Sequence, residues 1–178
     1  MAIQIGAKPD AGFDDPLGML KDCHRRIENF LRILCTVAQR ANGRALTQEE
    51  TEAIHAALHY FRVGGVRHNE DEEESLFPRM RADAAPVNEL EEIAGLESEH
   101  RVAAELHVEV EHLYKSWIDQ GSLAAAEAER LQTATGHLEA LYAKHIVIEE
   151  TVVFPRAAAS LAPQALAAIS AEFKARRQ

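Results

Sequence analysis

Two stretches of the sequence repeat one pattern of residues that could bind a cation. The first, HNEDEEESLFPRM, begins at His68, and the second, HIVIEETVVFPRA, begins at His145. Each places a glutamate four residues after the histidine (Glu72 and Glu149), and each has Phe-Pro-Arg at the same later position. Residues four apart lie on one face of a helix, so each stretch would present one imidazole and one carboxylate to the same side. Neutral imidazole and carboxylate together suit iron, zinc or manganese.

The segments around these stretches carry helix signals and almost no strand signals. Asp15 before a proline predicts the start of a first helix, and TQEE at Thr47 is a capping box that opens a second. A proline follows Phe77 and another follows Phe154, so we expect the second and fourth helices to end there. The expected long helices span residues 16–42, 48–77 and 86–121, with a fourth from after 122 to 154.

This order of elements predicts an all-α protein. Four long helices with short connections form an up-down-up-down bundle, in which sequence neighbours are antiparallel. We expect one domain over residues 1–178, with the bundle at about 15–155 and a short C-terminal helix at about 162–178. Gly64 and Gly65 interrupt the second helix and predict a local bend or a close helix approach there.

Each long helix has a histidine where the 3-4 spacing predicts an apolar core residue, and two helices add a glutamate one turn later. Because the helices alternate in direction, the positions of all four histidines can be measured from the same end of the bundle. At 1.5 Å per residue they fall roughly 12 to 21 Å from that end. We therefore expect them to converge on one cross-section. The six candidate metal ligands are His24, His68, Glu72, His100, His145 and Glu149.

The two glutamates indicate a cation. Burying each without a partner would cost several kcal/mol, and no lysine or arginine occupies a core position. Two glutamates that face each other could bridge a pair of metals. The absence of cysteine ligands argues against a structural zinc site.

Other polar residues near these positions have simpler interpretations. His107 also falls in a core seam, meaning the line of residues at 3-4 spacing that faces the core, and a hydrogen-bonded core histidine is its simpler interpretation. The core seam of the fourth helix is expected to continue to Val152. Four histidines lie off the seams and are expected at the surface or boundary: His55, His59, His112 and His137. The acidic residues around Glu72 are expected to form a solvated face: Glu70, Asp71, Glu73 and Glu74.

The order and spacing of the six candidates resemble the hemerythrin-like family, also called the HHE cation-binding family. The resemblance rests on His24 in CHRRIE, His68 with Glu72, His100 in ESEHR, and His145 with Glu149. Members carry a non-haem iron pair inside a four-helix bundle, so the resemblance implies iron as the cofactor, in a di-iron centre. Ferritin-like bundles instead use Glu-x-x-His pairs.

The sequence departs from the oxygen-carrying members of that family. They have a second histidine four residues after the one in the third helix, and this position is Ala104 here. In those members the carboxylate ligand of the fourth helix stands at the position of Glu150, so Glu150 is an alternative to Glu149 as the metal ligand. We prefer Glu149 because it follows its histidine by four residues, as Glu72 does. Glu28, four residues after a histidine, could add a carboxylate. Fewer imidazoles leave more open coordination positions, which favours a sensor or redox-linked protein over a plain carrier.

The resemblance thus implies a non-haem di-iron protein that binds or senses oxygen, nitric oxide or peroxide. One alternative is a di-iron oxidoreductase, either peroxide-consuming or an iron-centre repair protein. The repair proteins have an N-terminal cysteine-bearing segment, which Cys23 does not match. Another alternative is a helical interaction module with one structural cation. The residues leave open whether the protein is an enzyme, and they indicate no protein partner.

Composition excludes several partners. Lys plus Arg total 19 against 29 for Asp plus Glu, and the net charge of −10 argues against nucleic acid and anionic membranes. Apolar runs are too short to span a bilayer. The N-terminal stretch lacks the basic start and apolar segment of a signal peptide, so we expect a cytoplasmic protein.

Overall fold

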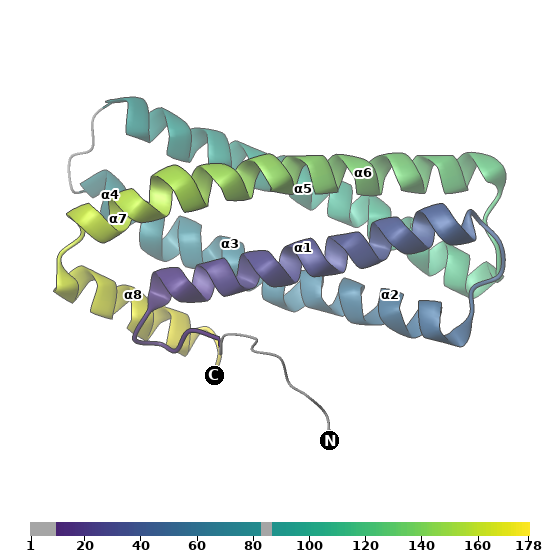
Figure 1. Ribbon diagram of the computed structural model, residues 1–178, viewed down its shortest axis with the longest axis horizontal. Coiled ribbons are helices and arrows are strands. Elements are labelled where there is room, and N and C mark those ends of the chain that lie inside the picture. The colour runs from purple at the N-terminus through teal and green to yellow at the C-terminus, as the bar shows by residue number, and fades with distance from the viewer. Residues whose placement is uncertain (1–9, 83–86) are drawn as a thin grey trace, which may run out of the picture.

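Four long helical segments lie side by side and alternate in direction, with connections at both ends of the bundle (Figure 1). The computed structural model describes residues 10–82 and 87–178, and every regular element in these residues is a helix. The α-helices are α1 (Pro16–Ala41), α2 (Gln48–Tyr60), α3 (Val66–Glu70), α4 (Phe77–Ala82), α5 (Val87–Gln120), α6 (Ala125–Ile148), α7 (Phe154–Ser160) and α8 (Pro163–Ala175). Three π-helical segments interrupt them: η1 (Phe61–Gly65), η2 (Asp71–Leu76) and η3 (Glu149–Val153). The predicted all-α bundle is confirmed. The predicted start of the third helix, at Pro86, lies outside the described residues.

Capping residues set the ends of the first two helices. The Asp15 side chain accepts a hydrogen bond from the Gly18 N–H at 2.9 Å, and Asn42 ends α1 in the left-handed conformation, with φ 44°. At the start of α2, the side chains of Thr47 and Glu50 each accept a hydrogen bond from the other's backbone N–H, at 3.2 and 2.9 Å. The capping box predicted from TQEE is therefore present, and such caps stabilise a helix end by about 1 kcal/mol.

The prediction that helices end at Phe77 and Phe154 is wrong, because the chain stays helical through the proline that follows each of them. In an α-helix, proline clashes with the carbonyl four residues earlier. Here a π-helical turn precedes each proline and widens the hydrogen-bond ladder. The Phe77 N–H bonds the Glu72 carbonyl, and the Phe154 N–H bonds the Glu149 carbonyl, five residues back in both cases. The repeated sequence pattern thus folds into a repeated local structure.

The wide turn of η3 also changes which side chains face the core. We expected Val152 in the core, but Val152 is half-buried and Val153 is 2% exposed. The extra residue in a π-helical turn advances the register relative to the 3-4 spacing of an α-helix. The core face downstream of Glu149 is therefore shifted by one residue.

The irregularity predicted at Gly64 and Gly65 is the π-helical segment η1. A Cβ atom on Gly64 would lie 2.6 Å from the Tyr60 ring, so the glycine lets this ring lie against the backbone. The Tyr60 hydroxyl donates a hydrogen bond to the Cys23 carbonyl at 3.2 Å, which links the end of α2 to α1. Glycine at this position makes room for the Tyr60 ring, whose hydroxyl reaches α1.

Two apolar layers fill the bundle, with a polar layer between them. On α1, for example, Leu20 belongs to one apolar layer and Ile27 to the other, and His24 lies between them. The same order recurs on the other three helical segments. Among the described residues, no single helix is long and apolar enough to cross a membrane, although the bent pair 125–160 and 163–175 passes the length and composition criteria together.

The C-terminal helix α8 packs against one end of the bundle, next to α1 (Figure 1). Arg176 and Arg177, just after α8, bind the two oxygens of Asp71 at 2.9 and 2.6 Å. Asp71 has no exposed surface, so its predicted place in a solvated acidic face is wrong. The C-terminal arginines compensate the burial of this carboxylate beside Glu72.

Candidate metal centre

The six candidate ligands meet in the polar layer, and each is at most 4% exposed. They form two groups in which one nitrogen or carboxylate oxygen from each member lies within 4.8 Å of the others. One group is His24, His68, Glu72 and Glu149, and the other is Glu72, His100, His145 and Glu149. Both glutamates belong to both groups. The arrangement therefore offers two adjacent cation positions that share two carboxylates.

The imidazoles form one pair at each of these positions. The rings of His24 (α1) and His68 (α3) have centroids 4.9 Å apart. The rings of His100 (α5) and His145 (α6) have centroids 4.7 Å apart, with their Nε2 atoms separated by 3.0 Å. All four helical segments thus supply one nitrogen donor each, while Glu72 and Glu149 come from the two π-helical turns η2 and η3. Such turns occur often at functional sites, because they redirect single side chains.

Unpartnered polar atoms show that the site fits a cation. Both oxygens of Glu72 and of Glu149, and Nε2 of His24, are buried without a hydrogen bond of good geometry. Nε2 of His24 and of His145 each lie 3.0 Å from a Glu149 oxygen, whereas the imidazoles nearest Glu72 are 3.5 Å away. Buried polar atoms in folded proteins are otherwise almost always paired. A cation would satisfy all of these atoms at once.

The environment shifts the pKa values of the cluster in opposite directions. Burial, together with the charge of Glu149, raises the pKa of Glu72 well above its usual range. Burial also raises the pKa of Glu149, but the imidazoles of His145 and His24 outweigh this effect and pull it below its usual range. Burial lowers the pKa of His68, so that this ring is neutral, the form in which imidazole binds metals. The charge of Glu149 thus opposes the ionisation of Glu72, and a cation bound to both carboxylates would stabilise both charges.

Three of the four imidazoles are oriented by a second carboxylate at their other nitrogen. Glu150 accepts from Nδ1 of His24 at 2.8 Å, Glu73 from His100 at 2.7 Å, and Glu99 from His145 at 2.9 Å. Carboxylates in this position fix the ring orientation and the tautomer of a ligating histidine, leaving Nε2 to face the metal. No sequence-based prediction assigned this role to them, although each carboxylate is a direct chain neighbour of a candidate ligand. The side chain of Glu73 is 40% exposed, so it keeps the solvent contact predicted for it while it also bonds His100.

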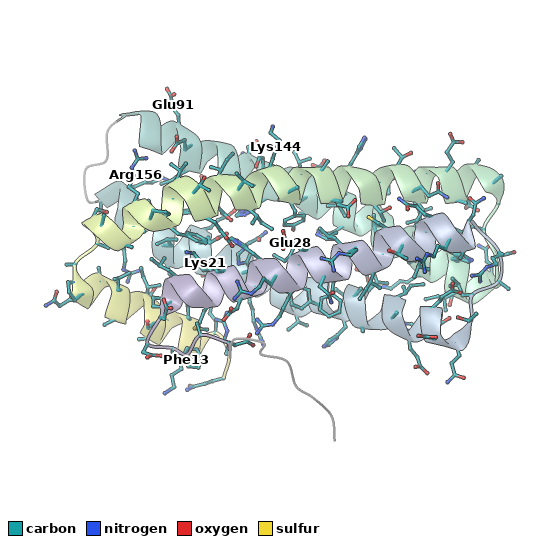
Figure 2. All side chains as sticks on the ribbon, viewed as in Figure 1. Phe13, Lys21, Glu28, Glu91, Lys144 and Arg156 are labelled. Atoms are coloured by element: carbon teal, nitrogen blue, oxygen red, sulfur yellow. The ribbon has the colours of Figure 1, made fainter. Side chains whose placement is uncertain are left out.

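The alternative carboxylates of the sequence analysis lie outside both groups. Glu149 is fully buried within the cluster, whereas the side chain of Glu150 is 34% exposed and reaches only the outer nitrogen of His24. Glu28, labelled on α1 in Figure 2, is exposed and belongs to neither group. Glu149 is thus the better placed carboxylate for a metal.

The remaining histidines also lie outside the cluster. His107 Nε2 and the Tyr142 hydroxyl are 3.2 Å apart, so His107 is a hydrogen-bonded core histidine. The histidines that fall off the predicted seams are all exposed: His55, His59, His112 and His137. The seam pattern therefore separated buried from surface histidines.

Comparison with known proteins agrees with this geometry. Residues 15–157 match the family model of the hemerythrin HHE cation binding domain. The chain is also 27% identical over 173 residues to an uncharacterized protein of Haemophilus influenzae (strain ATCC 51907 / DSM 11121 / KW20 / Rd), covering 94% of this chain and 93% of that protein. The family match spans all four helical segments that supply the cluster.

Proposed function

The chain belongs to the hemerythrin HHE cation-binding family, and from this premise we propose that it is a non-haem di-iron protein that binds or senses oxygen, nitric oxide or peroxide. The observation that supports this most strongly is the sharing of Glu72 and Glu149 between two pairs of buried imidazoles. Mixed imidazole and carboxylate ligands with no thiolate suit iron, and shared carboxylates suit two ions held close together.

The number of ligands favours a small additional ligand. Each group offers four ligand atoms, two nitrogens and two oxygens. Non-haem iron sites with few protein ligands keep positions open for oxygen or related molecules. Bound ferrous iron would supply these open positions and the electrons. Ala104, where the oxygen carriers have a further histidine, is exposed and adds no ligand.

The protein residues around the cluster would hold it dry and oriented. The Phe154 ring stacks on His24, with centroids 5.4 Å apart and planes 12° apart, and apolar layers close both sides of the polar layer. Glu73, Glu99 and Glu150 have side chains 31 to 40% exposed, so each links a buried imidazole to solvent. A proton could move along each of these hydrogen bonds without water entering the core.

The proposal is tested by loading the metal-free protein with ferrous iron under anaerobic conditions. Oxygen, nitric oxide and hydrogen peroxide are then added separately, and the visible spectrum is followed. The test variant is His145→Ala, and the matched control is His137→Ala, an exposed histidine on the same helix. We expect a new absorption band in the wild type and in His137→Ala, and its loss in His145→Ala.

The outcomes separate the candidate functions. A band that reverses when the small molecule is removed supports binding or sensing. Rapid, repeated consumption of peroxide by wild type and His137→Ala would instead favour a peroxide-consuming enzyme at the same cluster. Absence of iron uptake, together with an unchanged melting temperature on adding ferrous iron, would favour a helical interaction module and contradict the proposal.

A further inference from the structure

An arginine after α8 binds both sides of the π-helical turn that carries Glu72. The Arg176 guanidinium donates hydrogen bonds to three side chains of η2. The acceptors are a carboxylate oxygen of Asp71 at 2.9 Å, the Ser75 hydroxyl at 2.9 Å and a carboxylate oxygen of Glu74 at 3.2 Å. Asp71 precedes Glu72 in the chain, and the other two residues follow it. One guanidinium therefore ties together the two sides of a turn that holds a candidate ligand.

Burial makes these contacts difficult to break. Asp71 and Ser75 have no exposed surface, and the side chains of Arg176 and Arg177 are only 17% and 22% exposed. Arg177 donates to the second oxygen of Asp71 at 2.6 Å and to the Phe173 carbonyl at 2.8 Å. Hydrogen bonds between guanidinium and carboxylate are stronger than neutral ones, and separating a buried pair leaves an uncompensated charge. Movement of η2 away from α8 would unpair Asp71.

Apolar packing holds α8 against the same part of the chain. Phe173 of α8 has no exposed surface and lies in one apolar layer with Leu76, the last residue of η2, and with Phe77. Arg79 of α4 also pairs with both carboxylate oxygens of Glu172, at 2.6 and 3.0 Å. The helix α8 is therefore docked on the segment that positions Glu72.

The second copy of the repeated pattern does not have these acceptors. With His68 aligned on His145, the residues that correspond to Asp71 and Ser75 are Ile148 and Val152. Their side chains are apolar and cannot accept a hydrogen bond from a guanidinium. The polar contacts to α8 are therefore a feature of η2 and not a requirement of the π-helical turn itself.

We propose that Arg176 and Arg177 are positioning residues for the metal centre. They fix η2 in the conformation that places Glu72 in both groups of candidate ligands, so that docking of α8 strengthens metal binding. Coupling between two equilibria is reciprocal, so a bound metal in turn stabilises the docked C-terminal end. This inference rests on the cation site of the proposed function and requires neither iron nor a small-molecule ligand.

The test measures the Co²⁺ affinity of the full chain at neutral pH, by competition with a chelating indicator. Arg176→Met removes the three hydrogen bonds to η2 and leaves Arg177 on Asp71. We expect the affinity to fall at least about tenfold, as is typical when a contact behind a metal ligand is lost. Lys174→Met is the matched control, because Lys174 is exposed on the same helix and the change in charge is the same. Its affinity should equal that of the wild type.

Further measurements separate positioning from general stability. Leu34→Val lies in the other apolar layer, so it should lower the melting temperature and leave the Co²⁺ affinity of the folded chain unchanged. Hydrogen exchange of the amides of residues 172–178 should slow at least about tenfold when Co²⁺ binds the wild type, but not in Arg176→Met. If Arg176→Met does not fold, Arg176→Lys keeps the charge without the planar fork of donors and should have an intermediate affinity.

The outcomes distinguish this proposal from the metal centre on which it rests. Equal Co²⁺ affinity in the wild type and in the Arg176 variant, or equal losses in that variant and in Leu34→Val, would overturn the positioning role alone. Unchanged hydrogen exchange at the C-terminal end on Co²⁺ binding would overturn the coupling. A wild-type chain that takes up no Co²⁺ would overturn the cation site and the positioning role together.

Discussion

Replacing Glu72 with methionine should stabilise the metal-free protein while abolishing its stabilisation by metal. Both Glu72 oxygens are buried without a hydrogen bond, and the nearest imidazole nitrogens are 3.5 Å away. Removing one unsatisfied buried polar group recovers about 1–3 kcal/mol. Methionine has a similar length and no polar hydrogen, so the replacement fills the same space.

The expected magnitude is large enough to measure. A gain of about 1–3 kcal/mol raises the melting temperature by about 2–4 °C for each kcal/mol in a chain of this size. Metal bound at 100 times its Kd adds about 2.7 kcal/mol per site to the wild type. Glu72→Met removes a carboxylate shared by both groups, so most of that increment should disappear.

Urea denaturation of metal-free and metal-loaded protein measures both effects. Glu149→Met is the matched comparison, because its carboxylate lies 3.0 Å from Nε2 of both His24 and His145. Its loss removes the nearby carboxylate charge from two buried imidazoles, so this variant should be less stable than the wild type in the metal-free state. If metal-free Glu72→Met is instead destabilised by more than about 1 kcal/mol, the reasoning that Glu72 is unpaired without a cation is refuted.

Three further outcomes are expected. Glu99→Gln should lower metal affinity about 10–100-fold, measured by competition with a chelator, because the imidazole it orients loses its carboxylate partner. Replacing Arg176 and Arg177 together with methionine should cost about 3 kcal/mol in urea denaturation, because Asp71 is left buried and unpaired. The guanidinium of Arg44, which donates hydrogen bonds to Glu50, lowers the pKa of Glu50 to about 2. The stability that this ion pair contributes is therefore present above pH 4.5 and is lost as the pH falls toward 2. Glu50→Gln should accordingly flatten the fall in melting temperature across that range.

The helical bundle and the inward positions of the candidate ligands could be predicted because both depend on local spacing. The 3-4 period placed His24 and His100 in core seams, and the His-x-x-x-Glu spacing placed each glutamate on the face of its histidine. Level along the bundle followed from the rise per residue and the antiparallel order of the helices. These are properties of single helices and of their direction.

The π-helical turns could not be predicted by the same means. Proline after Phe77 and Phe154 indicates a helix end when only the α-helical ladder is considered. The widened turn before each proline uses a hydrogen bond to the carbonyl five residues back, and the 3-4 spacing of apolar residues carries no signal for it. It shifts the register after Glu149, and for this reason Val153 rather than Val152 reaches the core.

The outer carboxylates were missed because their role arises between helices. Glu99 lies on α5 and bonds His145 on α6, and Glu73 on η2 bonds His100 on α5. A charged residue beside a core position usually faces solvent, and these carboxylates are in fact 31% and 40% exposed. Their position next to a candidate ligand in the chain was the available signal.

The most direct test of the shared-carboxylate centre is the number of metal ions that the chain holds. Metal-free protein is titrated anaerobically with ferrous iron, passed through a desalting column, and assayed for iron and protein by elemental and amino-acid analysis. Two ions per chain in the wild type, and fewer in Glu72→Met and Glu149→Met, are the expected result. A wild-type chain that retains one ion or none would contradict a pair of cations bridged by these two glutamates.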